Sequence, residues 1–178
     1  MSKINFLAVD LDGVCISMSQ SAAYAHNIEL PKGIIPDDFL YKAVGNKKEF
    51  WRKCRGNEFW ANLEPYEWAK ELLTVIDKSG IDWCFLSKTS RDSGSSSGKY
   101  ECVEKFFPKY LNKLWLARGT KSYMASEGKA LLDDKIGNIN EWEAAGGIGI
   151  HWPELHPSEI EMARNRIERI GKILTDGS

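Results

Sequence analysis

Hydrophobic residues gather into short apolar runs that are separated by amphipathic or polar stretches. The five runs cover residues 4–9, 81–87, 114–117, 129–134 and 147–152. Each has the length and composition of a strand that is buried on both faces of a parallel sheet. Helical periodicity fills much of the chain between them, at 67–77, 100–110 and in the segment NINEWEAAGG. Strands that alternate with helices predict an α/β, Rossmann-like fold in which helices flank a parallel sheet.

The stretch from Ile16 to Pro65 interrupts this alternation. It is polar and aromatic, mostly helical in pattern, and broken by proline and glycine at Pro31, Gly33, Pro36 and Gly45. It is longer than an ordinary connection between parallel strands. We therefore interpret residues 16–65 as a small helical cap inserted after the first strand, with residues 1–15 and 66–178 forming the core.

Two further segments have distinct patterns. The segment RDSGSSSGK, residues 91–99, is rich in serine and glycine and predicts a flexible loop. Near the C-terminus, Ile160, Ile167, Ile170 and Leu174 form the apolar face of an amphipathic helix. We expect this helix to pack on the sheet, with contact to a second copy in a homodimer as the alternative.

The composition narrows the classes of function. With 24 basic and 25 acidic residues among 178, the net charge is −1, which argues against a general nucleic-acid or membrane-surface binder. No apolar run reaches the ~18 residues of a membrane span, and the first run is too short for a signal peptide, so we expect a cytoplasmic protein. Four cysteines without a CxxC pair disfavour a zinc site or a disulfide framework. A small-molecule substrate fits these features best.

Candidate chemistry gathers at the ends of the predicted strands. Asp10 and Asp12 follow the first strand, Ser87 ends the second, and Asp133 and Asp134 end the fourth. Ligands of open parallel sheets bind beyond the carboxyl ends of the strands. Residues two apart in extended chain face the same side, so Asp10 and Asp12 are expected to point at one ligand.

Carboxylates crowded together repel one another unless a cation or protons intervene. Mg²⁺ is the natural occupant, because proteins usually hold it with one or two carboxylates while waters and a substrate phosphate complete its shell. Ser87 and a lysine would then bind the non-bridging phosphate oxygens. Alone, DLDGV also fits a strand followed by an acid-rich turn, but its combination with FLS and LLDD in this chain order favours a phosphate site.

These motifs resemble those of the haloacid dehalogenase superfamily of phosphohydrolases. DLDGV resembles the first motif, FLS the second, and a lysine followed by LLDD the third and fourth. Within the superfamily, NEFWANLEPYEWAKELLTVIDKSGIDWCFLSKTS and LLDDKIGNINEWEAAGGIGIHW resemble segments of the 5'(3')-deoxyribonucleotidase family. The resemblance covers most of residues 4–152 and is weak over residues 17–48 and the C-terminal helix.

The resemblance implies a role for each motif residue. Asp10 would be the nucleophile that forms an aspartyl-phosphate. Asp12 would protonate the leaving oxygen and then activate water. Mg²⁺ would be bound by the Asp10 carboxylate, the Asp12 backbone carbonyl and Asp133, with Asp134 as a further ligand or an orienting group. Ser87 would hold the phosphate.

The identity of the phosphate-binding lysine is open, because Lys121 and Lys129 both precede LLDD. Family spacing favours Lys121, and we expect Lys129 to begin the strand. One departure from the family follows Ser87, where Lys88 and Thr89 replace a small or hydroxyl residue and a proline. We expect Lys88 to be solvated.

The aromatic residues bear on the substrate. The chain has seven tryptophans, and we expect Phe59 and Trp60 to line a nucleoside pocket, although buried aromatic residues are more often plain core. The leading hypothesis is a Mg²⁺-dependent 5'-nucleotidase acting on (deoxy)ribonucleoside monophosphates. One alternative is a phosphatase of another small phosphate ester or of a nucleic-acid terminal phosphate, whose basic groove the near-neutral composition does not supply. Another is a non-catalytic binding module, against which the presence of both Asp10 and Asp12 argues.

Overall fold

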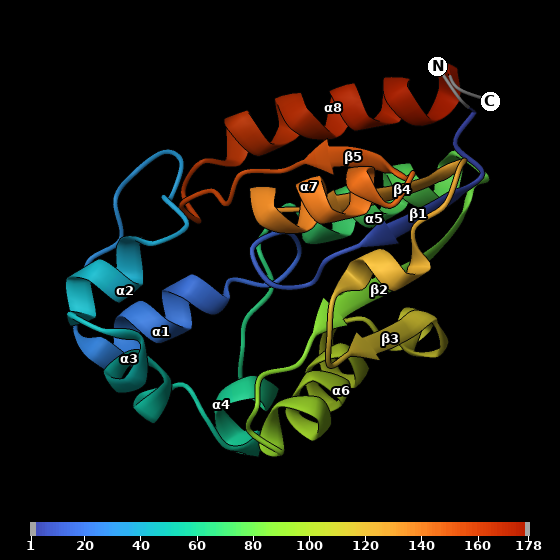
Figure 1. Ribbon diagram of the computed structural model, residues 1–178. Coiled ribbons are helices and arrows are strands. Elements are labelled where there is room, and N and C mark those ends of the chain that lie inside the picture. Colours follow the sequence, from blue (N-terminus) through green and yellow to red (C-terminus); the bar gives the residue numbers. More distant parts are fainter. Residues whose placement is uncertain (1–2, 177–178) are drawn as a thin grey trace.

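The computed structural model describes residues 3–176 and has a five-stranded, fully parallel sheet at its centre (Figure 1). The strands are β1 (Phe6–Val9), β2 (Asp82–Lys88), β3 (Leu114–Ala117), β4 (Lys129–Asp133) and β5 (Ile148–His151), in the order β3-β2-β1-β4-β5. The predicted strands and the α/β fold class are therefore confirmed, with strand ends shifted by no more than two residues.

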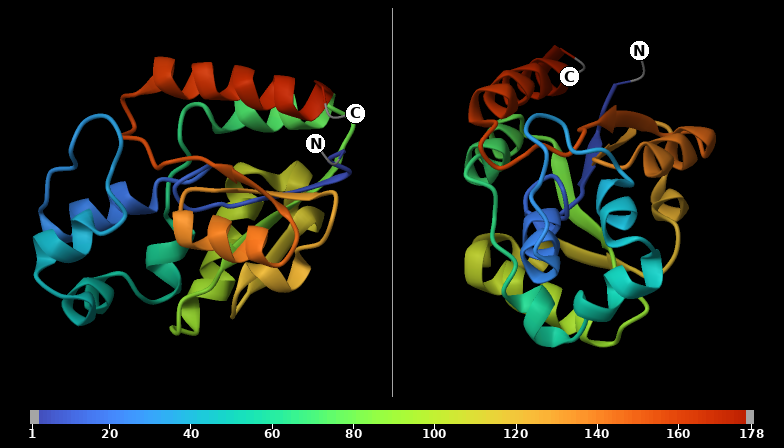
Figure 2. Two further views of the ribbon diagram at one scale, coloured as in Figure 1. Left: turned by 45° about the horizontal axis from the view of Figure 1, so that its top comes forward. Right: turned by 90° about the vertical axis from the view of Figure 1, so that its left-hand side faces the viewer.

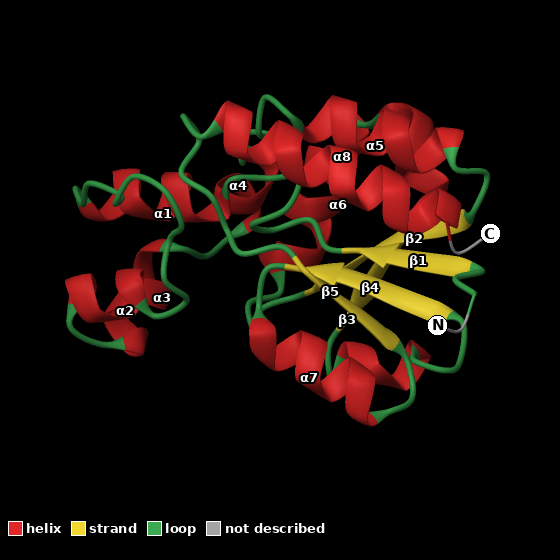
Figure 3. Ribbon diagram, turned by 90° about the horizontal axis from the view of Figure 1, so that it is seen from above, coloured by secondary structure: helices red, strands yellow, loops and turns green. Residues whose placement is uncertain are grey.

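Helices cover both faces of the sheet (Figure 3). They are α5 (Ala69–Lys78), α6 (Gly94–Phe106) and α8 (Ile160–Asp176) on one face and α7 (Ile136–Ala144) on the other. Alternation along β1 divides the core, because Leu7 and Val9 face the first set of helices while Ala8 faces α7. Ile167 and Leu174 of α8 are buried in the larger core, as expected for a helix that packs on the sheet. Within residues 3–176, the helices are all too short or too polar to cross a membrane.

Residues 16–65, here called the inserted segment, leave the sheet after β1 and return before α5. Its helices are α1 (Met18–His26), α2 (Phe39–Val44), α3 (Lys47–Lys53) and α4 (Asn57–Ala61). Helices α1–α3 lie beyond the end of the sheet to which the strand arrows point (Figure 3). They enclose a small core of their own, formed by Ala22, Ala23, Leu30, Ile35, Leu40, Phe50 and Cys54. The two ends of the segment lie side by side, bridged between Ile16 and Pro65.

The loop between α1 and α2 provides a second attachment, to the segment that connects β5 with α8. The Ile35 N–H donates to the Glu154 carbonyl at 2.9 Å, and the His156 N–H donates to the Gly33 carbonyl at 2.8 Å. Figure 2 shows this loop beside the chain that leads from β5 into α8. The inserted segment is thus fastened to the core at both its base and its loop.

The serine- and glycine-rich segment 91–99 is not a flexible loop, because helix α6 begins within it at Gly94. The cause is close packing against α4. A Cβ atom at Gly94 would lie 2.3 Å from the Asn57 nitrogen, and one at Gly98 would lie 2.5 Å from the Asn57 carbonyl oxygen. Residues four apart share one face of a helix. Glycine at both positions therefore lets α4 and α6 approach closely. The glycines that suggest a flexible linker in the sequence are in fact required by this helix contact.

All four cysteines are free and buried, which gives a first prediction. Burial raises the pKa of Cys54 and Cys102 to about 12 and that of Cys84 to about 11. At about pH 8 these groups are thiols, not the reactive thiolates. We expect the native protein to show no fast reaction with Ellman's reagent at that pH, and four equivalents to react after unfolding in guanidinium. A fast-reacting thiol in the native protein would contradict the packing described here.

Candidate active site

The strand order brings together the ends of β1, β2 and β4, which carry the candidate site residues. Val9 pairs with Phe85 of β2 on one side and with Leu132 of β4 on the other. The Asp10 N–H donates to the Leu132 carbonyl at 2.9 Å, so the ladder extends one residue beyond β1. Asp10 therefore emerges between β2 and β4, next to Asp133. The central place of β1 in the sheet makes this convergence unavoidable.

Asp10, Asp133 and Asp134 form a buried acidic cluster in which one carboxylate oxygen from each lies within 4.8 Å of the others. Burial raises the pKa of both Asp133 and Asp134, and the nearby charge of Asp10 raises them further. Two lysines offset part of this charge. Lys121 lies 2.8 Å from Asp10 Oδ1 and 2.7 Å from Asp133 Oδ2, and Lys135 lies 2.8 Å from Asp134 Oδ2.

The cluster fits a hard divalent cation. Its donors are all carboxylate oxygens, the ligands that Mg²⁺ prefers. Burial is the largest cause of the raised pKa values of Asp133 and Asp134, and the charge of neighbouring carboxylates adds to it. Among residues 3–176, Asp10 Oδ2 and the Asp12 backbone carbonyl form no hydrogen bond, so both oxygens are available to an ion. The residues present are therefore compatible with the expected metal.

Gly13 lets the loop after β1 pass close to this cluster. Its φ is +76°, a conformation that L-residues rarely adopt, and a Cβ atom there would lie 2.4 Å from Asp134 Oδ2. The loop is closed by the N–H groups of Cys15 and Ile16, which donate to the Leu11 carbonyl at 2.9 and 2.8 Å. The backbone of the DLDGV motif is thereby wrapped around a buried carboxylate.

Lys99 is a site residue that the sequence analysis missed. Its side chain is 2% exposed, although it carries a charge. The ammonium group donates to Asp12 Oδ2, to Ser87 Oγ at 2.8 Å and to the Lys88 carbonyl at 2.6 Å. It also lies 5.0 Å from the centre of a Trp60 ring. Lys99 therefore joins the ends of β1 and β2, whereas Lys121 joins those of β1 and β4.

The signal that would have revealed Lys99 lies in GSSSGK, residues 94–99. Its glycines are four residues apart, which is the spacing of small residues on one face of a packed helix. That spacing would predict a helix in this segment, and the helix would place Lys99, next to Gly98, near the strand ends. Sequence composition alone favours the loop, because serine and glycine are common in linkers.

The other lysines lie in different environments. Lys121 is buried in a 3₁₀ turn (Lys121–Met124), whereas Lys129 begins β4 at the far end of the strand, paired with Phe6. Lys88 is not solvated as expected. It is partly buried and donates to Asn138 Oδ1 at 2.6 Å, because it stands at the end of β2 facing the first turn of α7.

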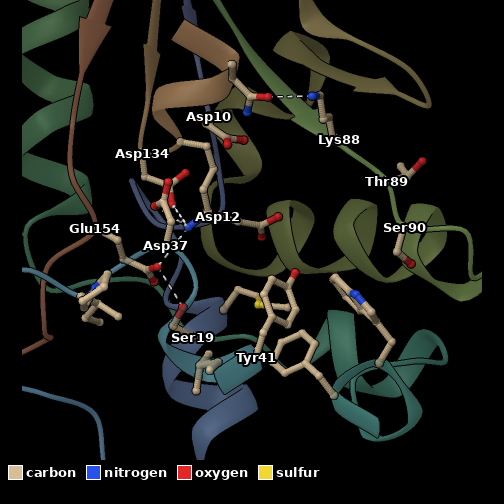
Figure 4. Close-up of a pocket in the computed structure, with 18 of the residues that line it drawn as sticks. Asp10, Asp12, Ser19, Asp37, Tyr41, Lys88, Thr89, Ser90, Asp134 and Glu154 are labelled. Atoms are coloured by element: carbon tan, nitrogen blue, oxygen red, sulfur yellow. Dashed lines mark hydrogen bonds and ion pairs between the residues drawn. The ribbon is translucent and has the colours of Figure 1, made fainter. Parts of the chain in front are cut away.

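A pocket of ≈ 400 Å³ opens beside Asp10 and Asp12, between the strand ends and the inserted segment (Figure 4). Its apolar lining comes from the inserted segment and consists of Met18, Ile35, Pro36, Leu40, Tyr41, Phe50, Trp51 and Trp60. Phe59 is not among the lining residues. It packs edge-on against Trp60, with ring centres 5.2 Å apart, and fills space between the two cores. The pocket therefore has an acidic end and an aromatic end.

Three buried polar atoms of the pocket have no hydrogen-bond partner within residues 3–176. They are Asp12 Oδ1, Thr89 Oγ1 and Trp60 Nε1. Buried polar groups in proteins are nearly always hydrogen-bonded. These three atoms therefore lack the partner that a buried polar group usually has.

A buried ionic network borders the pocket on the side of β5. Glu154 accepts hydrogen bonds from Ser19 Oγ at 2.8 Å and from the Tyr66 hydroxyl at 3.0 Å. Burial raises the pKa of the Glu154 carboxyl, while Lys135 opposes this effect from 3.8 Å. Lys135 also lies 3.3 Å from Asp37 of the inserted segment. This network links the acidic cluster to the rim of the pocket.

Solved structures with the same arrangement of helices and strands exist. The chain aligns over 96% of its length with 98% of a HAD-superfamily hydrolase from Ehrlichia chaffeensis, at a TM-score of 0.58 and 16% identity. It aligns over 99% of its length with 97% of a HAD family hydrolase from Deinococcus radiodurans R1 with bound phosphate and sodium, at a TM-score of 0.56 and 14% identity. The fold is that of the haloacid dehalogenase-like hydrolases. In sequence, no protein-family model and no curated protein matches the chain.

On this haloacid dehalogenase-like fold, most of the residues singled out from the sequence lie around one site. The structure brings together Asp10, Asp12, Ser87, Lys121, Asp133 and Asp134, with Trp60 at the pocket wall. Lys99 joins them from α6. Phe59 and Lys129 lie outside this group. The set offers carboxylates for a metal and for proton transfer, and two buried ammonium groups for an anion.

Proposed function

We propose that the chain is a Mg²⁺-dependent phosphomonoesterase that acts on nucleoside monophosphates, in the manner of the 5'(3')-deoxyribonucleotidases that its motifs resemble. The observation that carries the proposal is the convergence of Asp10 and Asp12 with the buried Lys99 and Lys121 at one end of a pocket with an aromatic wall. Structural neighbours described as hydrolases, one of them with phosphate bound, are consistent with it.

In the proposed reaction, Asp10 attacks the phosphorus atom of the substrate. The Leu11 N–H and Lys121 both bind Asp10 Oδ1, at 2.7 and 2.8 Å, and so hold the attacking carboxylate in a fixed orientation. Lys99 and the hydroxyl of Ser87 bind the phosphate oxygens, where negative charge must be stabilised. As the bond between phosphorus and the leaving oxygen breaks, that oxygen takes a proton from Asp12.

The second half of the reaction hydrolyses the aspartyl-phosphate. Asp12 now removes a proton from a water molecule, whose oxygen attacks the phosphorus. The bond from phosphorus to Asp10 breaks, inorganic phosphate leaves, and the free carboxylate of Asp10 is restored. Asp12 suits both steps because its side chain is 27% exposed, whereas Asp10 and Asp133 are almost fully buried.

Mg²⁺ bound by Asp10, Asp133, Asp134 and the Asp12 backbone carbonyl would neutralise charge on the phosphate and orient it. The protein holds the Asp133 carboxylate in position for this purpose. Its Oδ1 accepts hydrogen bonds from the Lys135 backbone N–H and from Asn138 Nδ2, both at 2.9 Å. Such supporting contacts fix the orientation of a metal ligand.

The inserted segment is proposed to act as a cap that selects the leaving group. Trp51 and Trp60 are nearly parallel, with planes 23° apart and ring centres 6.3 Å apart, and Tyr41 and Phe50 extend the same wall. Flat aromatic faces stack favourably on a nucleobase. The aromatic wall would therefore contact the base of a bound nucleotide.

A substrate panel tests this proposal. We expect phosphate release from nucleoside 5'-monophosphates in the presence of Mg²⁺, loss of that activity in EDTA, and its return when Mg²⁺ is added in excess. p-Nitrophenyl phosphate and glycerol phosphate serve as controls that lack a nucleobase. Cleavage of the controls without any nucleotide would contradict nucleotide specificity, activity that persists in EDTA would contradict the metal requirement, and no hydrolysis of any ester would contradict the enzyme.

A further inference from the structure

A second pocket lies beside the first and is lined by basic side chains. It has a volume of ≈ 570 Å³, and its lining consists of Lys47, Lys48, Trp51, Cys54, Arg55, Thr89, Ser90, Arg91 and Asp92. The two pockets are contiguous, because Trp51, Thr89 and Ser90 line both of them. A ligand that occupies the proposed active site can therefore extend into the second pocket, here called the basic pocket.

The positive charge of the basic pocket is only partly offset by the protein. Its four cations, Lys47, Lys48, Arg55 and Arg91, form no ion pair with a carboxylate within residues 3–176. Among residues 3–176, Asp92 supplies the only carboxylate that lines the pocket, and this carboxylate accepts a hydrogen bond from the Gly56 N–H at 2.7 Å. Clustered like charges that lack partners create a potential that attracts an anion.

The neighbouring surface of the inserted segment shows that this is a local feature. Lys42 pairs with Asp38 at 2.6 Å, and Arg52 pairs with Glu49 at 2.9 Å. The four cations of the basic pocket differ in lacking such partners, although the whole chain has a net charge of only −1. The near-neutral composition therefore conceals a concentrated basic region next to the proposed active site.

The end of β2 connects the two pockets over a short distance. Ser87 contacts Lys99 at the proposed phosphate site, and Arg91 lines the basic pocket four residues later. Four residues of extended chain span at most about 14 Å. Between them, the buried Thr89 Oγ1 has no hydrogen-bond partner within residues 3–176 and lies on the wall that both pockets share. One small molecule can reach both sites.

We propose that the basic pocket binds a second phosphate group carried by the leaving group of the substrate. This inference rests on the proposed function and narrows its substrate class to phosphomonoesters that carry another phosphate on the nucleoside. Arginine and lysine side chains bind phosphate strongly through charge-assisted hydrogen bonds. Trp51, which lines both pockets, would stack against the base between the two phosphates. A free nucleoside bisphosphate and the phosphorylated end of an oligonucleotide both present this chemistry.

The test compares substrates that share one base and one sugar. We would measure kcat/KM with Mg²⁺ for a deoxynucleoside 5'-monophosphate, the matching 3',5'-bisphosphate and the matching 5'-phosphorylated dinucleotide. Both the bisphosphate and the dinucleotide are expected to exceed the monophosphate by about 10-fold or more at low ionic strength, from at least one charge-assisted contact. The preference should shrink as KCl is added. A higher value for the dinucleotide than for the bisphosphate would identify an oligonucleotide end as the source.

Charge-removal variants locate the effect. In the double variant Lys48→Gln with Arg91→Gln, the ratio of kcat/KM for bisphosphate to that for monophosphate is expected to fall toward one. The control variant, Lys105→Gln with Lys172→Gln, removes two exposed charges from α6 and α8 and should keep the wild-type ratio. Equal kcat/KM for monophosphate and bisphosphate in the wild type would overturn the inference while leaving the proposed function standing.

Calorimetry separates failure of the inference from failure of the proposed function. The dissociation constants of the bisphosphate and of the monophosphate are measured for the wild-type protein in the same buffers. They report binding whether or not either ligand is hydrolysed. If no ester is hydrolysed, the proposed function fails, but about 10-fold tighter binding of the bisphosphate, lost in the Lys48→Gln, Arg91→Gln variant, would still support a second-phosphate site. Equal binding of the two ligands would overturn it.

Discussion

Replacement of Asp10 by asparagine is expected to abolish phosphate release, with kcat lower by ~10³-fold or more. The amide oxygen of asparagine is a poor nucleophile and cannot form the acyl phosphate. The protein itself should remain folded. Removal of one negative charge relieves repulsion with Asp133 and Asp134, and Lys121 keeps Asp133 as a partner. We therefore expect the free energy of unfolding, measured without Mg²⁺, not to decrease.

Trapping of the intermediate distinguishes the role of Asp10 from that of a residue that only binds metal. Acid quenching of the wild type during turnover, followed by borohydride reduction, should convert residue 10 to homoserine, which mass spectrometry detects. Asp12→Asn should turn over slowly yet still form the phosphoenzyme, whereas Asp10→Asn should form none. As a control, Asp82→Asn removes an exposed carboxylate at the far end of β2 and should behave like the wild type. Label on any residue other than Asp10 would contradict the mechanism.

The second large effect is expected for Lys99→Met. Methionine fills most of the buried volume beside Trp60 but removes the ammonium group from Asp12, Ser87 and the Lys88 carbonyl. If Lys99 binds the phosphate, its loss should lower kcat/KM by ~10²- to 10³-fold, in the range found for single groups that stabilise developing charge. Buried acceptors left without a donor should also lower the free energy of unfolding by about 1–3 kcal/mol.

The matched control for this variant is Lys105→Met. Lys105 lies on the same helix but is exposed, and its ammonium group lies 4.4 Å from the centre of the Phe106 ring. It should retain wild-type kinetics and near wild-type stability. If Lys99→Met lost stability but kept kcat/KM, Lys99 would be a structural residue, and Lys121 would remain as the buried lysine near the phosphate.

The sheet and the acidic end of the site are predictable from sequence for the same reason. Strands buried on both faces are nearly continuous apolar runs, and acids that follow such runs must emerge at one edge of a parallel sheet. Asp10, Asp12 and Asp133 are therefore placed near one another by local patterns and strand order alone. No knowledge of the inserted segment is needed for that part.

The aromatic end and the two lysine sites depend on contacts between distant segments, which local patterns do not determine. Whether Phe59 or Trp60 faces the pocket depends on how α4 is rotated, and that rotation is set by its contact with Gly94 and Gly98. Lys99 becomes a site residue only because that contact makes its segment helical. Net charge is likewise a sum over the whole chain, so it does not predict which cations lie together.

The close contact of α4 with α6 also has an evolutionary consequence. A Cβ atom at Gly98 would lie 2.5 Å from the Trp60 Cβ, and the next residue is Lys99. The residue proposed to recognise the base and the residue proposed to hold the phosphate are thus parts of one rigid joint. A different insertion between β1 and α5 would fit only if it also packed against Gly94 and Gly98 of α6. Changes in specificity at this site are therefore tied to the geometry of the proposed catalytic groups.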